Sequence, residues 1–170
     1  MTDHALLKRM LKFRSDPKNR SPHAQFVGME LVDIDRDRGT VRIPYAAALA
    51  GNGETGVLHG GVITAALDSA CGFAVAAAFA QQVRIATLDL RIDYLKPATP
   101  GAAVLASGHC YKVTRHVAFV RGLAYHADRE DEPIANCTAT FMITPYAAGA
   151  GPAESPMEQP APVAEPGALP

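Results

Sequence analysis

Alternating apolar and polar positions dominate the second half of the chain. From Ile85 to Tyr94, one face of the expected strand carries Ala86, Leu88, Leu90, Ile92 and Tyr94, and the other face carries Thr87, Asp89, Arg91 and Asp93. This two-residue period is typical of a strand with one buried face. Three further strands are predicted over about 103–113, 116–126 and 134–144, and we expect all four to form an antiparallel meander. Residues 29–45, with a polar turn that ends in a glycine, predict a hairpin.

A helical pattern replaces this alternation in the middle of the chain. After the turn-rich segment 51–56, an alanine-rich apolar run from about Gly60 to Ala80 predicts one long helix. Asp68 lies within that run, and burying a carboxylate without partners costs about 1–3 kcal/mol even in protein hosts. Asp68 therefore needs a partner or a function. Small side chains would let a sheet approach this helix closely, chiefly at Ala65, Ala66, Ala70 and Gly72.

The elements together predict an α+β domain over residues 21–145. A curved antiparallel sheet of about five to six strands would wrap the central helix and cover its apolar surface. Residues 1–20 are expected to form a short amphipathic helix and a linker, because apolar residues before position 13 recur at helical spacing. Residues 146–170 are rich in proline and alanine without periodicity, which predicts a disordered tail.

Bulk charge and cysteine content limit the classes of partner. The net charge of -1 gives no general attraction for nucleic acid or an anionic membrane. An aspartate at the centre of a membrane-spanning helix costs about 2.5–3.5 kcal/mol, so we expect the apolar run to be a buried core helix. Cys71, Cys110 and Cys137 are odd in number and lie in apolar surroundings, which indicates free core thiols. Residues 1–13 contain several charged side chains and therefore lack the uninterrupted apolar core of a secretion signal. We expect a cytoplasmic protein.

Three neighbouring features in the helical region are candidates for chemistry. Gly60 and Gly61 lie at the helix start, where amide groups lack intrahelical partners and can hold an oxyanion, although a glycine pair also makes an ordinary turn. His59 is a candidate to donate to a substrate carbonyl, to act as a base, or only to satisfy loop backbone groups. Asp68 is a candidate nucleophile or general base, with a structural role as the alternative.

Spacing along the helix constrains how these residues can cooperate. Eight positions separate Gly60 from Asp68, a rise of about 12 Å at ~1.5 Å per residue. One helix therefore cannot bring both groups to the same carbon atom. A two-fold dimer with antiparallel helices would place Asp68 of one chain near Gly60 of the other and create two identical composite sites.

The order of these motifs resembles a known family over roughly residues 26–144. The chain is similar to hotdog-fold thioesterases of the phenylacetate-pathway (PaaI-like) type in Asn52, Gly56-Val57-Leu58-His59-Gly60-Gly61, Asp68, Thr87-Leu88-Asp89-Leu90 and Tyr94-Leu95-Lys96-Pro97. The resemblance implies a hotdog fold, a homodimer often paired into a tetramer, and hydrolysis of acyl-coenzyme A (acyl-CoA) thioesters without a metal or other cofactor.

The resemblance also assigns roles to individual positions. Asp68 matches the catalytic carboxylate, which attacks the thioester carbon or activates water, and Gly60 matches the backbone N–H donor to the thioester carbonyl. His59 lies beside that donor, Asn52 would orient thioester or water, and Thr87 matches a small hydroxyl residue that positions water. The segment that follows Asn52 is one residue longer than the family pattern.

Substrate contacts and alternative functions remain open at the level of sequence. Gly61 would contact the substrate, and Arg84, Lys96 and Arg115 are candidates to meet the phosphates of CoA, although surface cations are commonly only solvated. The acyl group is expected to be an aryl group or a short to medium chain. A hotdog-fold enoyl-thioester hydratase or dehydratase with His59 as the base is one alternative. A non-catalytic acyl-CoA binding protein is the other.

Overall fold

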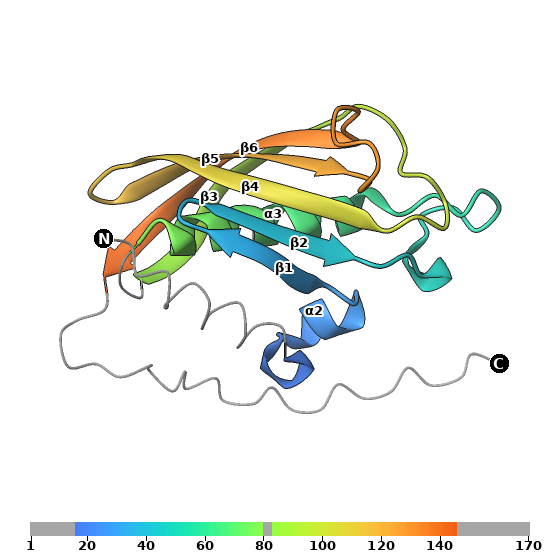
Figure 1. Cartoon of the computed structure of the whole chain (residues 1–170), viewed down its shortest axis with the longest axis horizontal. Helices are drawn as coiled ribbons and strands as arrows, with labels where there is room; N and C mark the ends of the chain where they lie inside the picture. The colour runs from blue at the N-terminus through green and yellow to red at the C-terminus, as the bar shows by residue number, and fades with distance from the viewer. Residues whose placement is uncertain (1–15, 80–82, 146–170) are drawn as a thin grey trace, which may run out of the picture.

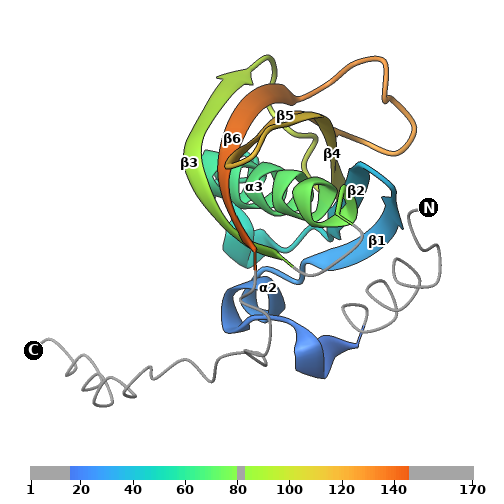
Figure 2. The same cartoon turned by 90° about the vertical axis from the view of Figure 1, so that its left-hand side faces the viewer.

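A curved antiparallel sheet wraps one long helix in this protein (Figures 1 and 2). The structure, a computed structural model, describes residues 16–79 and 83–145. In the end-on view of Figure 2 the six strands curve around the helix, which lies inside the concave face of the sheet. The predicted hotdog architecture is therefore confirmed. The amphipathic helix predicted near the N-terminus and the tail predicted after residue 145 lie outside the described residues.

The element boundaries follow the periodicity of the sequence closely. In chain order the elements are η1 (Pro17–Asn19), α2 (Pro22–Phe26), β1 (Glu30–Asp35), β2 (Arg38–Ile43), η2 (Ala47–Leu49), α3 (Gly60–Ala77), β3 (Val83–Tyr94), β4 (Val104–Val113), β5 (Val117–Tyr125) and β6 (Ala135–Pro145). The predicted hairpin is confirmed as β1 and β2, which pair antiparallel. The predicted long helix is confirmed as α3, which ends at Ala77 rather than near Ala80.

The order of strands differs from the predicted meander. The sheet order is β1-β2-β4-β5-β6-β3, so β4, β5 and β6 form a meander while β3 lies at the far edge and pairs with β6. The prediction that β3 precedes β4 in the meander is therefore wrong. A hairpin between neighbours normally takes two to five residues. The connection over residues 95–103 is longer, contains Pro97 and Pro100, and crosses the end of the sheet.

A β-bulge divides β3 into two halves of opposite phase. The register against β6 shifts between Thr87 and Asp89, and an extra residue in one strand moves the following side chains to the other face. Leu90 and Ile92 pack against the core as predicted. Before the bulge the predicted phase is wrong, because Leu88 is 56% exposed and Thr87 instead points its hydroxyl toward α3.

Helix α3 is the centre of the hydrophobic core. Its buried residues are Val62, Ile63, Ala66, Leu67, Ala70, Cys71, Ala74, Val75 and Ala77. Of the four small residues expected at close contacts, Ala66 and Ala70 have no exposed surface, whereas Ala65 and Gly72 are half-buried. By length and composition α3 could cross a membrane, but here the sheet covers it as the core helix of the domain.

Glycines on the sheet allow the closest approach of α3. A Cβ atom added at Gly108 of β4 would lie 2.7 Å from the carbonyl oxygen of Ala70. A Cβ atom added at Gly39 of β2 would lie 2.7 Å from the Cβ of Phe73. Both distances are too short for real side chains, so α3 packs directly against the backbone of these two strands. Glycines on the sheet, as well as alanines on the helix, therefore allow the close approach.

The three cysteines are free and buried, as predicted. The Sγ atoms of Cys71 and Cys137 lie 3.7 Å apart between α3 and β6. The hydrogen bond to Cys137 and burial together raise the pKa of Cys71 far above its usual range. Burial likewise raises the pKa of Cys110. A protonated thiol is a poor nucleophile, so Cys71 contributes to packing.

Candidate active site

The turn before α3 holds its backbone by several hydrogen bonds and leaves one amide unused. The His59 N–H donates to the Leu49 carbonyl at 2.9 Å, and the His59 carbonyl accepts from the Val62 N–H at 2.9 Å. The Gly61 N–H donates to Nδ1 of His59 at 2.9 Å, so His59 is the N-cap of the helix. Within the described part of the chain, the Gly60 N–H has no acceptor. It therefore remains free, at the positive end of the helix dipole, to bind an anion or a polarised carbonyl.

The cap also determines what the His59 side chain can do. Because Nδ1 accepts the Gly61 N–H, a neutral imidazole in this arrangement carries its proton on Nε2. The ring is at an exposed position, so its Nε2–H is available as a donor. The capping role agrees with the backbone-satisfying interpretation of His59, and the donor role is compatible with it.

Asp68 and Thr87 are brought together across the gap between α3 and β3. Asp68 is half-buried near the middle of α3, and its Oδ1 accepts a hydrogen bond from Oγ1 of Thr87 at 2.9 Å. The bulge in β3 makes this contact possible, because it turns Thr87 toward the helix. The hydroxyl fixes the orientation of a carboxylate that otherwise lies among apolar residues.

Two hydroxyl groups that sequence reasoning did not single out hold the glycine pair. The hydroxyl of Tyr94 donates to the Gly60 carbonyl at 2.9 Å, and Oγ1 of Thr64 donates to the same oxygen at 3.2 Å. The two hydroxyl oxygens lie 2.8 Å apart. Tyr94 belongs to the quoted Tyr94-Leu95-Lys96-Pro97 motif, and the strand period placed it on the face of Leu90, but neither signal predicted its contact with Gly60.

Asn52 shapes the loop that leads to the glycine turn. Its Oδ1 accepts the N–H groups of Glu54 and Thr55 at 2.8 and 3.0 Å, and its carbonyl accepts the N–H of Gly56 at 2.9 Å. Gly56 has a φ of 70°, which favours glycine, and its carbonyl accepts the Tyr45 hydroxyl at 3.0 Å. The side-chain oxygen of Asn52 is thus engaged in the turn, and its amide nitrogen is the part of the side chain left for other contacts.

An apolar pocket of about 370 Å³ adjoins the glycine turn. Helix α2 and η2 form one side and the first turns of α3 form the other. The lining includes Phe26, Val27, Leu49, Val62 and Ala65, with His59 and Gly61 beside them. Such a lining suits the apolar part of a ligand whose polar end lies at the turn.

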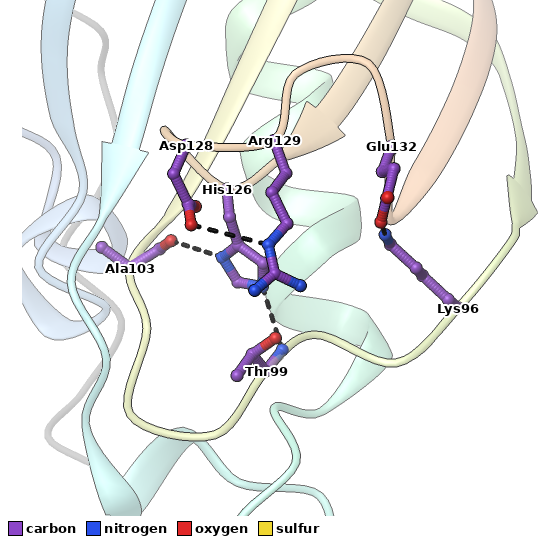
Figure 3. A network of polar contacts seen from close by, with 7 residues as sticks. All are labelled: Lys96, Thr99, Ala103, His126, Asp128, Arg129 and Glu132. Carbon is purple, nitrogen blue, oxygen red and sulfur yellow. Dashed lines mark hydrogen bonds and ion pairs between the residues drawn. The ribbon is translucent and has the colours of Figure 1, made fainter.

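Of the three basic residues predicted to meet phosphates, Arg84 and Arg115 lie at the same end of the sheet and Lys96 lies at the other. Arg84 is opposite Thr144 on β6. The carbonyl of His116, next to Arg115, accepts the N–H of the neighbouring Ile143. Arg84 is near the start of β3 and Lys96 just beyond its end, which places them more than about 30 Å apart at ~3.3 Å per strand residue. Arg115 lies at an exposed position between β4 and β5. Nζ of Lys96 pairs with Glu132 at 2.7 Å and holds the pKa of that carboxyl below its usual range (Figure 3).

His126 anchors the connection that carries Lys96. This buried side chain accepts the Thr99 N–H on Nε2 at 2.9 Å, so its Nδ1 donates to the Ala103 carbonyl at 2.8 Å (Figure 3). The imidazole thereby joins both ends of the 99–103 segment. Within residues 16–79 and 83–145, no group of three or more histidine, cysteine, aspartate or glutamate side chains could hold a metal ion.

Comparison with known proteins points to one family. A family described as the thioesterase superfamily matches residues 55–132, which contain the glycine turn, α3 and β3. The medium/long-chain acyl-CoA thioesterase YigI of Escherichia coli K12 is 30% identical over 135 residues, which cover 72% of this chain and 85% of that protein.

Solved structures show the same fold. A Pseudomonas aeruginosa protein is 40% identical with a TM-score of 0.68, and the match covers 81% of this chain and 98% of that one. The PaaI protein from the phenylacetic acid degradation operon of E. coli has a TM-score of 0.69 at 15% identity, over 81% of this chain and 94% of that one. The second likeness concerns the fold alone.

Proposed function

The chain belongs to the thioesterase superfamily and is a thioester hydrolase, and we propose that it cleaves acyl-CoA into a free acid and CoA. The observation that carries the proposal is the unused Gly60 N–H at the start of α3, in a turn whose neighbouring amides are bonded. A donor fixed in this way is suited to the carbonyl oxygen of a thioester, on which negative charge develops during acyl transfer.

The proposed reaction uses the groups that the glycine turn and α3 present. The Gly60 N–H donates to the thioester oxygen, and the Nε2–H of His59 is a second donor nearby. The carboxylate of Asp68 attacks the carbonyl carbon, or takes a proton from a water that does so, while the Thr87 hydroxyl keeps it oriented. The C–S bond then breaks and CoA leaves as a thiolate. If Asp68 attacked, water then hydrolyses the anhydride between Asp68 and the acyl group, which releases the acid and supplies the thiolate with a proton. If Asp68 acted as a base, the acid forms directly and the proton that Asp68 took passes to the thiolate. The amide group of Asn52 would orient the thioester or the water.

The same arrangement calls for two chains. Because Gly60 and Asp68 are about 12 Å apart along one helix, each site would combine Gly60 of one subunit with Asp68 of the other. The edge strand β3 supports this proposal, because among residues 16–79 and 83–145 it pairs only with β6, which leaves its second edge open to a copy of itself. Leu88, Tyr94 and Leu95, on and just after β3, are more than half exposed in the single chain. Two such dimers would pair in a tetramer.

The pocket beside the turn favours an aliphatic acyl group. Its lining is mainly apolar and begins at His59 and Gly61, so a chain attached to the carbonyl at Gly60 could enter it directly. The similar protein YigI is named for medium and long acyl chains. We propose a medium-length acyl-CoA as the preferred substrate over an aryl-CoA. The CoA phosphates would meet Arg84, Lys96 or Arg115, and the proposed location is the cytoplasm.

The cap on His59 argues against the hydratase alternative. A hydratase of the kind considered would need an imidazole nitrogen free to take a proton, whereas Nδ1 already accepts the Gly61 N–H. The remaining Nε2–H is a donor, which serves a thioesterase. A pure binding protein would have no use for a carboxylate held by Thr87 in an apolar helix.

The test is a thiol-release assay over acetyl-, octanoyl-, palmitoyl- and phenylacetyl-CoA. We expect the wild type to prefer octanoyl-CoA and Asp68→Asn to lower kcat at least about 100-fold with the fold retained, because the amide can neither attack nor accept a proton. Asp131→Asn, at an exposed carboxylate in the connection between β5 and β6 and away from the proposed subunit interface, is the control and should keep full activity. An Asp68→Asn protein with the wild-type rate, or a wild type that only hydrates an enoyl-CoA, would overturn the proposal.

A further inference from the structure

We propose that Tyr94 is a positioning residue that holds Gly60, the residue that supplies the oxyanion donor, in place. Acting with Thr64, it holds the peptide group between Gly60 and Gly61 in one orientation. The inference rests on the proposed function, because it assigns the Gly60 N–H to the substrate carbonyl. Neither the sequence pattern nor the comparisons give these two hydroxyl groups a role.

The central observation is that one peptide group is held at both ends. Its carbonyl oxygen, on Gly60, accepts hydrogen bonds from the hydroxyls of Tyr94 at 2.9 Å and Thr64 at 3.2 Å. Its N–H, on Gly61, donates to Nδ1 of His59 at 2.9 Å. Rotation of this peptide would break bonds at both of its ends. The preceding peptide, which carries the Gly60 N–H, is held by the bond from the Val62 N–H to the His59 carbonyl at 2.9 Å, so Gly60 is restrained on both sides.

Such restraint is needed because glycine does not restrain itself. Two consecutive glycines have the widest range of backbone dihedral angles, and amides in the first turn of a helix have no partner in the preceding turn. An N–H donor whose direction varies by tens of degrees stabilises a transition state poorly, because the stabilisation of the oxyanion depends on a donor that is already aligned. The ring of Tyr94 also lies against Gly60, because a Cβ added there would be 3.3 Å from the Tyr94 hydroxyl oxygen.

The hydroxyl pair connects the helix start to the rigid sheet. Tyr94 is the last residue of β3 and is paired with Ala135 of β6, and the next amide, of Leu95, donates to the Ile134 carbonyl at 2.8 Å. Thr64 lies one turn into α3 and its Oγ1 is 2.8 Å from the Tyr94 hydroxyl. The position of the glycine turn is therefore set by the strand end and by the helix together.

The contacts also form a polarised chain that ends at His59. A hydroxyl that donates to an amide carbonyl makes the N–H of the same amide a stronger donor. Here that N–H is the one bonded to Nδ1 of His59. Removing the Tyr94 hydroxyl should therefore loosen both the peptide and the imidazole cap.

The activity test compares two tyrosines with equal exposure. Tyr94→Phe removes only the hydroxyl, and we expect kcat for octanoyl-CoA to fall about 3–10-fold, the range of one ordinary hydrogen bond, with KM changed less than about twofold. Tyr111→Phe is the control, because Tyr111, on β4, is also 53% exposed but contacts the guanidinium group of Arg121 on β5. Thr64→Val should lower kcat by a similar factor. Thr64→Ser, which keeps the hydroxyl, should have a kcat close to that of the wild type.

A second readout does not require activity. Hydrogen exchange of the Gly61 amide, followed by NMR, should be several-fold faster in Tyr94→Phe and Thr64→Val than in the wild type, and unchanged in Tyr111→Phe and Thr64→Ser. If the wild type releases no thiol from any acyl-CoA, the proposed function fails, and this exchange measurement alone decides whether the two hydroxyls hold the peptide. Unchanged Gly61 exchange together with unchanged kcat in Tyr94→Phe would overturn the inference.

Discussion

The contact between Asp68 and Thr87 shows how a single hydroxyl can adapt a carboxylate to an apolar helix. Its Oγ1–Oδ1 distance of 2.9 Å is that of an ordinary hydrogen bond, and the acceptor is the group proposed to attack the thioester or to activate water. The neighbouring residues on α3 are largely apolar, so Thr87 provides the polar partner that the sequence indicated Asp68 would need.

We therefore predict that Thr87→Val lowers kcat at least tenfold, since hydrogen bonds to charged groups contribute about 1.5–3 kcal/mol. Valine keeps the β-branched shape and the strand, and loses only the hydroxyl donor. Steady-state thiol release measures the effect. Thr87→Ser keeps the donor and should retain most of the activity; equal rates for the valine and serine variants would show that the hydroxyl does not serve Asp68.

At this scale the sequence offered candidate residues but not their contacts. Asp68, Gly60 and His59 were selected from their types and order, and Thr87 from the family resemblance. The hydroxyl donors on the Gly60 carbonyl were missed, because Tyr94 is 34 positions away from Gly60 and only the folded chain brings them together. A role for His59 in satisfying backbone groups was among the alternatives. The backbone geometry at the helix start, rather than the residue type, shows that His59 caps the helix.

At the scale of elements, local periodicity predicted strands and the helix well but not their neighbours. Alternation is a property of one strand and its two faces, so the bounds of β4, β5 and β6 are within one residue of the prediction. Strand order depends on which surfaces meet after folding, which local periodicity does not show. In the structure β3 lies beside β6. The bulge in β3 likewise follows from pairing with β6, and the regular alternation of the sequence concealed it.

Close packing between α3 and the sheet gives an element-scale prediction. Gly108→Ala should lower the free energy of unfolding by about 1–3 kcal/mol, because the new methyl would lie 2.7 Å from the Ala70 carbonyl oxygen and force α3 away from β4. Urea denaturation measures the change. Gly53→Ala, where an added Cβ has no atom within 4 Å, is the control and should shift stability by less than about 0.5 kcal/mol. A Gly108→Ala protein as stable as this control would contradict such tight packing.

At the scale of the whole molecule, the proposed catalytic groups of one chain lie in two separate places. The Gly60 amide at the start of α3 and the Asp68 carboxylate near its middle lie too far apart to share one carbon atom, although the structure orders both locally. Sequence spacing was enough to predict this separation. It could not predict the surface that would join two chains. The feature that suggests one is the outer edge of β3, which no other strand in the described part of the chain pairs with.

Mixing two inactive variants tests whether the site is shared. Gly60→Pro removes the donor amide at a helix position that accepts proline, and His59, with φ of -62° and ψ of 137°, already has the backbone conformation favoured before proline. If sites are shared, a heterodimer with Asp68→Asn contains one site with both groups intact. Random exchange at equal amounts should then restore about a quarter of wild-type activity.

A chain with both substitutions gives the opposite expectation and completes the argument. Paired with a wild-type chain, it would spoil both shared sites, so an equal mixture after exchange should fall to about a quarter of wild-type activity rather than the half expected when each chain works alone. Pull-down of differently tagged subunits establishes that exchange has occurred. No recovery in the first mixture and a half in the second, with exchange complete, would mean that Gly60 and Asp68 of the same chain act together, against the distance that α3 sets between them.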